Sequence, residues 1–269
     1  MMVAKKIVAA SLAVTSSSAF TTSRSAPHGR RVGLGSSTLE SRSDPAIRTM
    51  VAEASAKSFV PVPLIHRTAV WGAAGSAGVL MADDALPAPL RALVGSVLIF
   101  SNFEYFFHRF VMHAPPGGAL ETYQDLHVTH HVETGRDQSL DGGADTDPRH
   151  IYFSGTTTLA SILISTLGLE ALTGVFDLGF DPATSLGISA LVALLHTSIW
   201  QTLHGDIHEY YSEYPGALPR ADVLSTDSPY TRWLVENHVG HHLVGGKGNY
   251  NIVFPGPDYL WGTCFQPER

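Results

Sequence analysis

Residues 182–205 have the sequence PATSLGISALVALLHTSIWQTLHG, which contains no Asp, Glu, Lys or Arg. Residues 151–169, IYFSGTTTLASILISTLGL, are likewise free of formal charge. A helix needs about 20 predominantly apolar residues to cross the hydrocarbon core of a bilayer. The two stretches therefore predict a membrane-spanning helical hairpin, with spans at about residues 151–174 and 183–205. Because the stretch at 151–169 is short for a span, a buried or interfacial helix is the alternative there.

A second hairpin is predicted upstream of the first. Residues 68–82 are rich in Gly and Ala and carry no charge, and residues 90–107 are interrupted only by Arg91 and Glu104. The spans expected here are at about 68–82 and 88–107. The chain is therefore predicted to be an all-α integral membrane protein with about four transmembrane helices in two hairpins. Its charged fraction of 15% agrees with this, since soluble proteins average about 25%.

The distribution of charge predicts which ends of the spans face the cytosol. The two predicted turns carry five acids and a single base, Arg91. Most of the Lys and Arg residues lie toward the opposite ends: Lys57, Arg67, Arg109, Arg136, Arg149, Arg220, Arg232 and Lys247. Because Lys and Arg are enriched in loops that stay on the cytosolic side, these ends are expected in the cytosol or its topological equivalent.

The first 50 residues predict a targeting presequence, and residues 51–269 the membrane domain. A basic region at 1–6, an apolar run at 7–14 and small residues at 15–19 form a signal-peptide pattern. Residues 21–48 are rich in Ser and Arg and poor in acids, as transit peptides are. The whole resembles the bipartite presequence of algae with secondary plastids, so a plastid membrane is the expected location. An ordinary secretory signal, leading to the ER membrane, or a tail without an address is the alternative.

The charge balance and the single cysteine exclude several kinds of site. Residues 1–50 carry seven Lys or Arg and two Asp or Glu, whereas residues 51–269 carry ten and 22. A body so acidic is a poor match for nucleic acid, whose binding depends on neutralising phosphates. With Cys264 alone, the chain cannot form an intramolecular disulfide or a cysteine-based metal cage. Any metal must therefore be bound by nitrogen and oxygen ligands.

Histidine is the unusual residue of the chain. It occurs 14 times, more often than Phe or Tyr, and ten of the 14 form four groups on the side expected in the cytosol. The candidate metal ligands are His108, His113, His127, His130, His131, His204, His208, His238, His241 and His242. Histidines in such numbers beside a bilayer are costly to desolvate unless they bind metal or are paired. A histidine-rich metal-binding cap is therefore predicted on one face of the membrane.

The spacing within three of the groups predicts convergent imidazoles. Residues three or four apart lie on one face of a helix, so His204 can share a target with His208. In each H-x2-H-H group, at 127–131 and 238–242, the first histidine can share a target with either of the others. Imidazole is a ligand for Fe, Zn, Cu and Ni, so the ligand type alone does not choose the metal.

The remaining group, His108 and His113, has a spacing of five, which diverges on an ideal α-helix. Convergence of this pair would need the helix to end or unwind before Pro115 and Pro116. The order of the groups is duplicated, since the second span of each hairpin ends in a spaced pair that an H-x2-H-H group follows. This duplication suits two metal ions, each approached from several segments.

The other histidines and the nearby acids carry separate predictions. We expect His28, His66 and His150 to be ordinary surface or core residues. His196, two helical turns before His204, could line a substrate cavity or form a hydrogen bond between helices. Nearby acids could orient ligand imidazoles by accepting their second N–H. These acids are Glu104, Asp125, Asp206, Glu209 and Glu236.

Three motifs carry a family resemblance: EYFFHRFVMH at 104–113, LHVTHH at 126–131 and NHVGHH at 237–242. With the closing segment at 248–263, they resemble the membrane fatty acid hydroxylase/sterol desaturase superfamily over about residues 68–264. The resemblance implies an all-helical membrane enzyme with four spans and a dimetal centre, usually two iron ions. It also implies that the ten clustered histidines are the ligands.

The implied reaction uses O2 and two electrons to oxidise an unactivated C–H bond of a lipid. Such a reaction needs a stronger oxidant than any side chain supplies, so the metal must supply it while the protein positions the lipid and excludes water. Zinc could occupy the same ligands. The implied partners are the lipid and an external electron donor, such as a cytochrome b5 or a ferredoxin.

The order of the histidine groups is closest to fatty acyl and sphingolipid hydroxylases, so a fatty acyl-type lipid is the first expectation, for hydroxylation or desaturation. Carotenoid ring hydroxylases and sterol oxidases are the alternatives within the superfamily. A membrane zinc hydrolase or a metal transporter is the alternative of another class. Against these, no H-E-x-x-H motif occurs, and the polar groups gather at one end of the spans.

Overall fold

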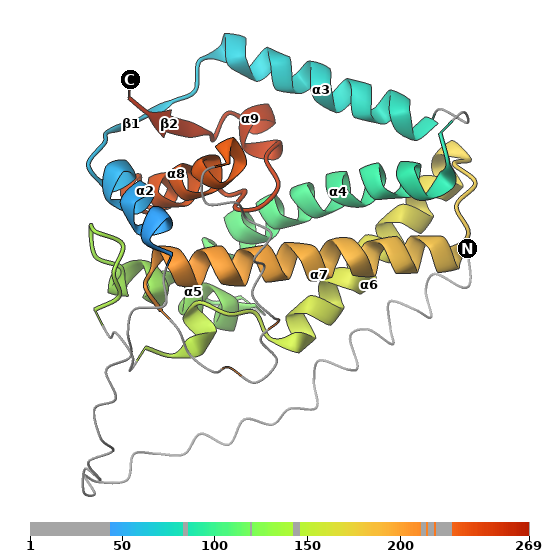
Figure 1. The fold of residues 1–269 in the computed structure, drawn as a ribbon. Coiled ribbons are helices and arrows are strands. Elements are labelled where there is room, and N and C mark those ends of the chain that lie inside the picture. Colours follow the sequence, from blue (N-terminus) through green and yellow to red (C-terminus); the bar gives the residue numbers. More distant parts are fainter. Residues whose placement is uncertain are drawn as a thin grey trace, which may run out of the picture. The chain divides into compact units, whose positions relative to one another are not determined.

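Long helices dominate the described part of the chain (Figure 1). The structure is a computed structural model, which describes residues 44–82, 86–118, 120–141, 146–210, 214, 218 and 228–268. The signal-peptide and transit-peptide patterns of the sequence lie outside the described residues.

The elements include one π-helix, η1, and one 3-10 helix, η3. In chain order they are α2 (Pro45–Ser55), β1 (Phe59–Pro61), α3 (Leu64–Ala82), α4 (Ala88–Phe107), η1 (His108–Met112), α5 (Glu121–Glu133), η3 (Pro148–His150), α6 (Gly155–Phe176), α7 (Pro182–Ile207), α8 (Pro229–Leu243), α9 (Pro257–Trp261) and β2 (Phe265–Pro267).

Three helical segments are long and apolar enough to cross a membrane: Ala88–Met112, Pro148–Val175 and Pro182–Ile207. Within them, α4 packs against both α6 and α7, and α6 packs against α7. Phe100, Val192 and Ala193 are buried where α4 meets α7. These segments coincide with three of the four predicted spans, which supports a helical membrane protein.

The fourth predicted span, at residues 68–82, is helical but differs from the other three. It forms most of α3, which is not among the segments apolar enough to count as a span. None of the α3 side chains that the structure describes is buried, and α3 contacts only the neighbouring α4 and α9 to any extent. Its middle is built from Gly, Ala and Ser, which offer little apolar surface. Four spans in two hairpins therefore stay a prediction.

The chain is mostly helical but not all-α, because it contains a two-stranded antiparallel sheet. Phe59 of β1 lies opposite Pro267 of β2, and Pro61 lies opposite Phe265. The pairing ties the end of the chain to the segment before α3. Strands of three residues are too short to show an alternating pattern, which is why the sequence did not predict them.

Polar side chains at the helix N-termini explain where four helices begin. Asp44, Ser154, Asp181 and Ser228 precede α2, α6, α7 and α8, and each accepts a hydrogen bond from a backbone N–H of the first turn. Such a cap stabilises a helix by about 1 kcal/mol. Proline follows three of these caps, at a position where its missing N–H costs nothing.

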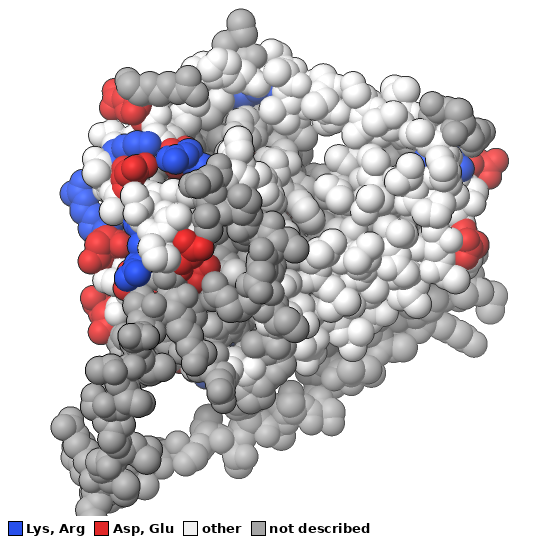
Figure 2. Space-filling view, in the orientation of Figure 1, with Lys and Arg blue, Asp and Glu red and all other residues white. Residues whose placement is uncertain are grey.

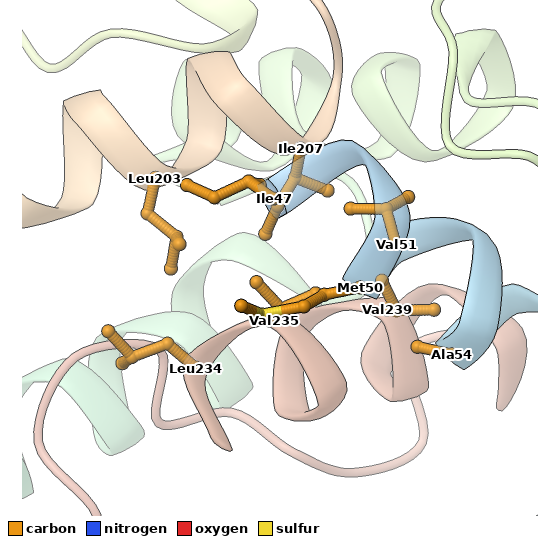
Figure 3. Packing of buried hydrophobic residues seen from close by; sticks show 9 residues of the cluster. All are labelled: Ile47, Met50, Val51, Ala54, Leu203, Ile207, Leu234, Val235 and Val239. Atoms are coloured by element: carbon orange, nitrogen blue, oxygen red, sulfur yellow. The ribbon is translucent and has the colours of Figure 1, made fainter. Parts of the chain in front are cut away.

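The helix α2 belongs to the folded unit, although the prediction placed its first half in the presequence. Its apolar face packs against the C-terminal end of α7 and the middle of α8 (Figure 3). The buried cluster consists of Ile47, Met50, Val51, Ala54, Leu203, Ile207, Leu234, Val235 and Val239. The predicted boundary at residue 50 therefore falls inside α2, and the folded part begins at or before Asp44.

Charged side chains are concentrated at the ends of the long helices. On the face shown in Figure 2, most of them lie at the end formed by α2 and α8, and a broad uncharged surface separates them from the opposite end. Exposed apolar side chains occur along α6 and α7, among them Leu159, Leu163, Leu167, Leu191 and Leu194. An apolar band between two charged ends is the surface expected of a protein in a bilayer.

Candidate metal centre

The ten clustered histidines meet at one end of the long helices. His108 and His113 stand at the two ends of η1, three histidines lie on α5, two end α7 and three lie on α8. All ten turn Nε2 toward the Nε2 of at least one other, and the resulting contacts divide them into two groups of five. The predicted convergence of the ten histidines is therefore present.

The first group joins His108, His113, His127, His131 and His241. Nε2 of His127 lies 2.9 Å from Nε2 of His108, 3.0 Å from that of His113 and 3.1 Å from that of His131. Nε2 of His241 lies 3.1 Å from that of His113 and 2.9 Å from that of His131. All but His131 lie close enough together for each to offer a ligand atom to one metal ion.

The second group joins His130, His204, His208, His238 and His242. Nε2 of His130 lies 3.1 Å from Nε2 of His204 and 3.2 Å from that of His242. Nε2 of His238 lies 3.0 Å from that of His208 and 3.2 Å from that of His242. All five could offer ligand atoms to one ion, since these atoms lie within 4.8 Å of one another.

The four-residue spacing decides which histidines of α5 and α8 share a group. His127 stays with His131, and His238 stays with His242. The histidines three residues on, His130 and His241, point to the opposite group. Each of the two helices, α5 and α8, therefore contributes histidines to both groups. The sequence left both pairings open.

His131 lies between the two groups. Its ring centroid is 4.3 Å from that of His242 in the second group, although its Nε2 contacts only the first group. The imidazole of His131 therefore contacts both groups, and a displacement of this side chain would disturb the histidines of each group.

The pair His108 and His113 converges because the winding of the helix loosens locally, one of the two ways that the sequence allowed. At His108, α4 passes directly into the π-helix η1, which has more residues per turn than an α-helix. The N–H of His113 donates to the carbonyl of His108 at 3.1 Å, which closes a turn of five residues. The two rings consequently stack, with centroids 5.2 Å apart. The π-turn thus places two side chains five residues apart on one face of the helix, whereas an α-helix would point them in different directions.

Main-chain carbonyls fix the orientation of four imidazoles. In each case Nδ1 lies 2.6 to 3.1 Å from a carbonyl oxygen. The four pairs are His108–Tyr250, His204–Ile151, His208–Gln138 and His241–Gly248. Since a carbonyl can only accept, Nδ1 carries the proton and Nε2 keeps a lone pair. Two unprotonated Nε2 atoms therefore point into each group.

Four of the five acids that were predicted to orient ligand imidazoles have other surroundings, and the fifth, Asp206, is buried at 1% exposure. Glu104 contacts His196, which belongs to neither group, and Glu236 pairs with a lysine before β1 at 3.1 Å. Asp125 and Glu209 are exposed. The sequence could not reveal the carbonyl acceptors, because every residue has a carbonyl and only the fold decides which one reaches a ligand.

Burial keeps the imidazoles neutral. Loss of water lowers the pKa of His113 to about 4 and that of His131 to about 3. Burial, reinforced by repulsion between neighbouring imidazoles, also holds the pKa of six others well below the usual range: His127, His130, His208, His238, His241 and His242. Neutral imidazole is the form that binds metal, so these side chains are ready as ligands near pH 7.

We expect the metal-free protein to lose stability as the pH falls below about 6.5, the ordinary pKa of histidine. Below that pH the unfolded chain binds protons on these imidazoles, whereas the folded site resists protonation until the pH approaches about 4 for His113. Stability is therefore complete above pH 6.5 and declines progressively below it. Thermal unfolding in detergent across this range checks the prediction, and a melting temperature unchanged down to about pH 5 would contradict it.

Gly246 lets the loop after α8 close over the first group. Its φ of +68° lies in the left-handed region, and a Cβ there would be 2.4 Å from Cε1 of His113. The preceding Gly245 has nearly the same φ, +66°, but a Cβ there would meet nothing within 4 Å. The two glycines thus share a backbone requirement, and only Gly246 also makes room for a ligand.

We expect Gly246→Ala to lower the metal content of the purified protein and Gly245→Ala to leave it unchanged. Both substitutions strain the backbone by about 1 kcal/mol, so both should lower the melting temperature slightly. Only the methyl group at 246 would displace the imidazole of His113. Elemental analysis of the two variants measures the difference, and equal metal content would contradict this role of Gly246.

Two adjoining cavities border the histidine groups. The outer cavity, of about 170 Å³, touches His127 of the first group and His204 of the second. The inner cavity, of about 40 Å³, lies among α4, α6 and α7 and touches His108. The residues that line both are Met112, Phe153, Thr157 and Trp200. A molecule at this junction would lie beside both groups at once.

The four histidines outside the groups largely follow their predictions. His196 both lines the inner cavity and bonds Glu104 across the helices, at 3.0 Å from Nε2 to Oε1. His150 pairs with Glu133 at 2.8 Å, and His66 is exposed. His28 lies outside the described residues.

The donor set fits metal ions. Two nitrogens bound at right angles, each about 2.1 Å from one ion, lie about 3.0 Å apart, and about 3.4 Å apart at a tetrahedral angle. The contacts of 2.9 to 3.2 Å between Nε2 atoms match the first arrangement. Buried, neutral and convergent imidazoles could therefore hold a metal ion in each group.

Comparison of the chain with protein-family models, with curated proteins and with solved structures gave no match.

Proposed function

We propose that this protein is an O2-dependent lipid hydroxylase or desaturase, in which metal ions held by the two histidine groups oxidise an unactivated C–H bond. The observation that carries the proposal is the junction of two largely apolar cavities beside both groups. A site that only stored or transported metal would have no use for such a cavity, and the three apolar helices give it access to membrane lipids.

The ten clustered histidines would hold two metal ions, one in each group, with iron as the first candidate and zinc as a possible occupant. Such ions would supply the oxidant, derived from O2, that removes hydrogen from an alkyl carbon. In hydroxylation, one oxygen atom enters the C–H bond and the other leaves as water, with two electrons and two protons from outside. We expect the electrons to come from a separate carrier, such as a cytochrome b5 or a ferredoxin.

The chain's own residues position the ligands and the substrate. The carbonyls of Ile151 and Tyr250 hold the protons of His204 and His108 on Nδ1, so that Nε2 stays available. Trp200, which is 3% exposed, lines both cavities where they adjoin. Its large apolar side chain would keep water from the reacting carbon. A substrate in the junction is thereby placed beside the ligands of both groups.

The substrate we expect is a fatty acyl-type lipid, with carotenoid rings and sterols as the alternatives. The inner cavity supports an apolar substrate, because it lies among α4, α6 and α7 and has aromatic walls. The aromatic residues are Phe100, Phe103, Phe107, Phe153 and Trp200. The plastid or ER location follows from the presequence alone and is part of the proposal.

Incubation of the purified, iron-loaded protein with membrane lipids, a reductant and O2 tests the proposal. We expect an oxidised lipid that forms only when both O2 and reductant are present. Turnover that needs neither would instead indicate a zinc hydrolase. Lipid profiling of cells lacking the protein, covering acyl chains, sterols and carotenoids together, would then name the substrate. No change in any of the three pools would contradict the proposed substrate classes.

A further inference from the structure

The inner cavity contains a buried polar pair, Glu104 of α4 and His196 of α7. The two side chains bond at 3.0 Å, from Nε2 of His196 to Oε1 of Glu104. Glu104 is 6% exposed and His196 is 7% exposed. Neither belongs to the histidine groups, and both lie within apolar helices where a polar side chain is costly unless it has a partner or a function.

The protein's own donors occupy Glu104 fully. Its carboxylate accepts hydrogen bonds from the backbone N–H of Val253 at 3.0 Å and of Phe254 at 3.3 Å, and from the amide of Asn251 at 3.4 Å. Oε1, which already accepts from the N–H of Val253, is the oxygen that faces Nε2 of His196, and a carboxylate oxygen accepts, so His196 donates to it through Nε2. The burial of Glu104 is thus explained by the C-terminal segment that it holds.

The same bond leaves His196 with an unused acceptor. With its proton on Nε2, the neutral imidazole has a lone pair on Nδ1. Among the described residues, Nδ1 has no hydrogen-bond partner, while the ring lines the inner cavity. Aromatic rings surround it, with the centroids of Phe100 and Phe254 each 5.5 Å away. The protein thus leaves this acceptor beside the cavity without a donor of its own.

We infer that His196 recognises a hydroxyl group of the lipid substrate, whose O–H donates to Nδ1. This inference rests on the proposed function, and it narrows the substrate to a lipid that already carries a hydroxyl. A plain hydrocarbon or a methyl ether has no donor to offer and would leave Nδ1 unpaired.

The helices also set the distance between this hydroxyl and the carbon that reacts. His196 precedes His204 by eight residues on α7, and Glu104 precedes His108 by four residues on α4. At 1.5 Å per residue, these separations are about 12 Å and about 6 Å along the helices. The oxidised C–H bond is therefore several carbon–carbon bonds away from the recognised hydroxyl.

The test is the binding of two matched probes, octadecan-1-ol and its methyl ether, to the purified full-length protein without O2 or reductant. The ether keeps the chain and the oxygen but loses the donor. We expect the alcohol to bind roughly tenfold more tightly than the ether. In His196→Phe this ratio should fall to about one, and in His196→Gln, which keeps a side-chain acceptor, part of it should remain.

His150→Phe is the matched control, because His150 lines only the outer cavity. It should keep the preference for the alcohol. Loss of the preference in this control would place the hydroxyl in the outer cavity and overturn the inference. Metal content shows whether each variant retains its folded cap.

Equal affinity of the unmodified protein for the alcohol and the ether would also overturn the inference, and this comparison needs no variant. A preference that persists unchanged in a folded His196→Phe variant would do the same. The proposed function fails independently, if neither bound probe nor any membrane lipid is oxidised once O2 and reductant are added.

Discussion

Replacement of one ligand in either group, by His108→Ala or by His238→Ala, is expected to abolish product formation and to remove about half of the bound metal. Each side chain is at most 2% exposed and turns Nε2 toward its group. Loss of a directly bound imidazole should weaken metal binding by more than the 10- to 100-fold that loss of a hydrogen-bonded neighbour costs. Because the proposed reaction would use the metals of both groups, either loss should stop it.

The matched control is His66→Ala, which removes an exposed imidazole outside both groups. It should retain full metal content and most of the activity. Elemental analysis and product formation from one preparation provide the comparison. If His108→Ala and His238→Ala both kept their metal and their activity, the assignment of the two groups as the reaction centre would be wrong.

The sequence predicted three long helices and the ten histidines, because both depend on local features. A charge-free stretch of 20 residues has few alternatives to a membrane helix, and a spacing of four, as in His204 and His208, has the same meaning on any helix. The predicted start of the folded unit was less accurate. The sequence of α2 is basic at Arg48 and has a short apolar face, and only its packing against α7 and α8 shows that it is part of the fold.

What the sequence could not predict depends on contacts between distant segments. Whether His130 joins His127 or His204 is decided by the placement of α5 against α7. The π-turn after His108 has no compositional signal, because only its hydrogen bonds distinguish it from an α-helix. The sequence could not show that Glu104 accepts hydrogen bonds from residues 251–254, because only the fold brings this segment back to α4.

Glu104→Ala is expected to be the most destabilising single substitution in the apolar helices. It would leave two backbone N–H groups, an amide and an imidazole without their acceptor. Loss of a buried charged partner costs about 3 to 5 kcal/mol, which corresponds to roughly 10 °C in melting temperature for a chain of this size. The loosened segment begins at Tyr250, whose carbonyl orients His108, so metal content should fall as well.

Glu170→Ala is the matched control for this prediction. Glu170 lies on the neighbouring α6, and its buried Oε1 has no hydrogen-bond partner among the described residues. Its removal should change the melting temperature little, and Glu104→Gln, which keeps one acceptor oxygen, should fall between the two. Similar melting temperatures for Glu104→Ala and Glu170→Ala would show that the hydrogen bonds of Glu104 to the C-terminal segment do not stabilise the fold as expected. Thermal unfolding in detergent, with metal content from the same samples, measures both effects.

Because main-chain carbonyls orient the imidazoles, the candidate metal centre should tolerate substitutions in the loops that supply them better than insertions or deletions. Any amino acid at position 151 or 250 supplies the same carbonyl oxygen, so a substitution there that preserves the packing does not alter which nitrogen of the ligand carries the proton. An insertion or deletion in these loops would instead rotate a carbonyl away. The cavity walls beside Ile151 can thus be redesigned for another ligand by substitution, provided that the loop lengths are kept.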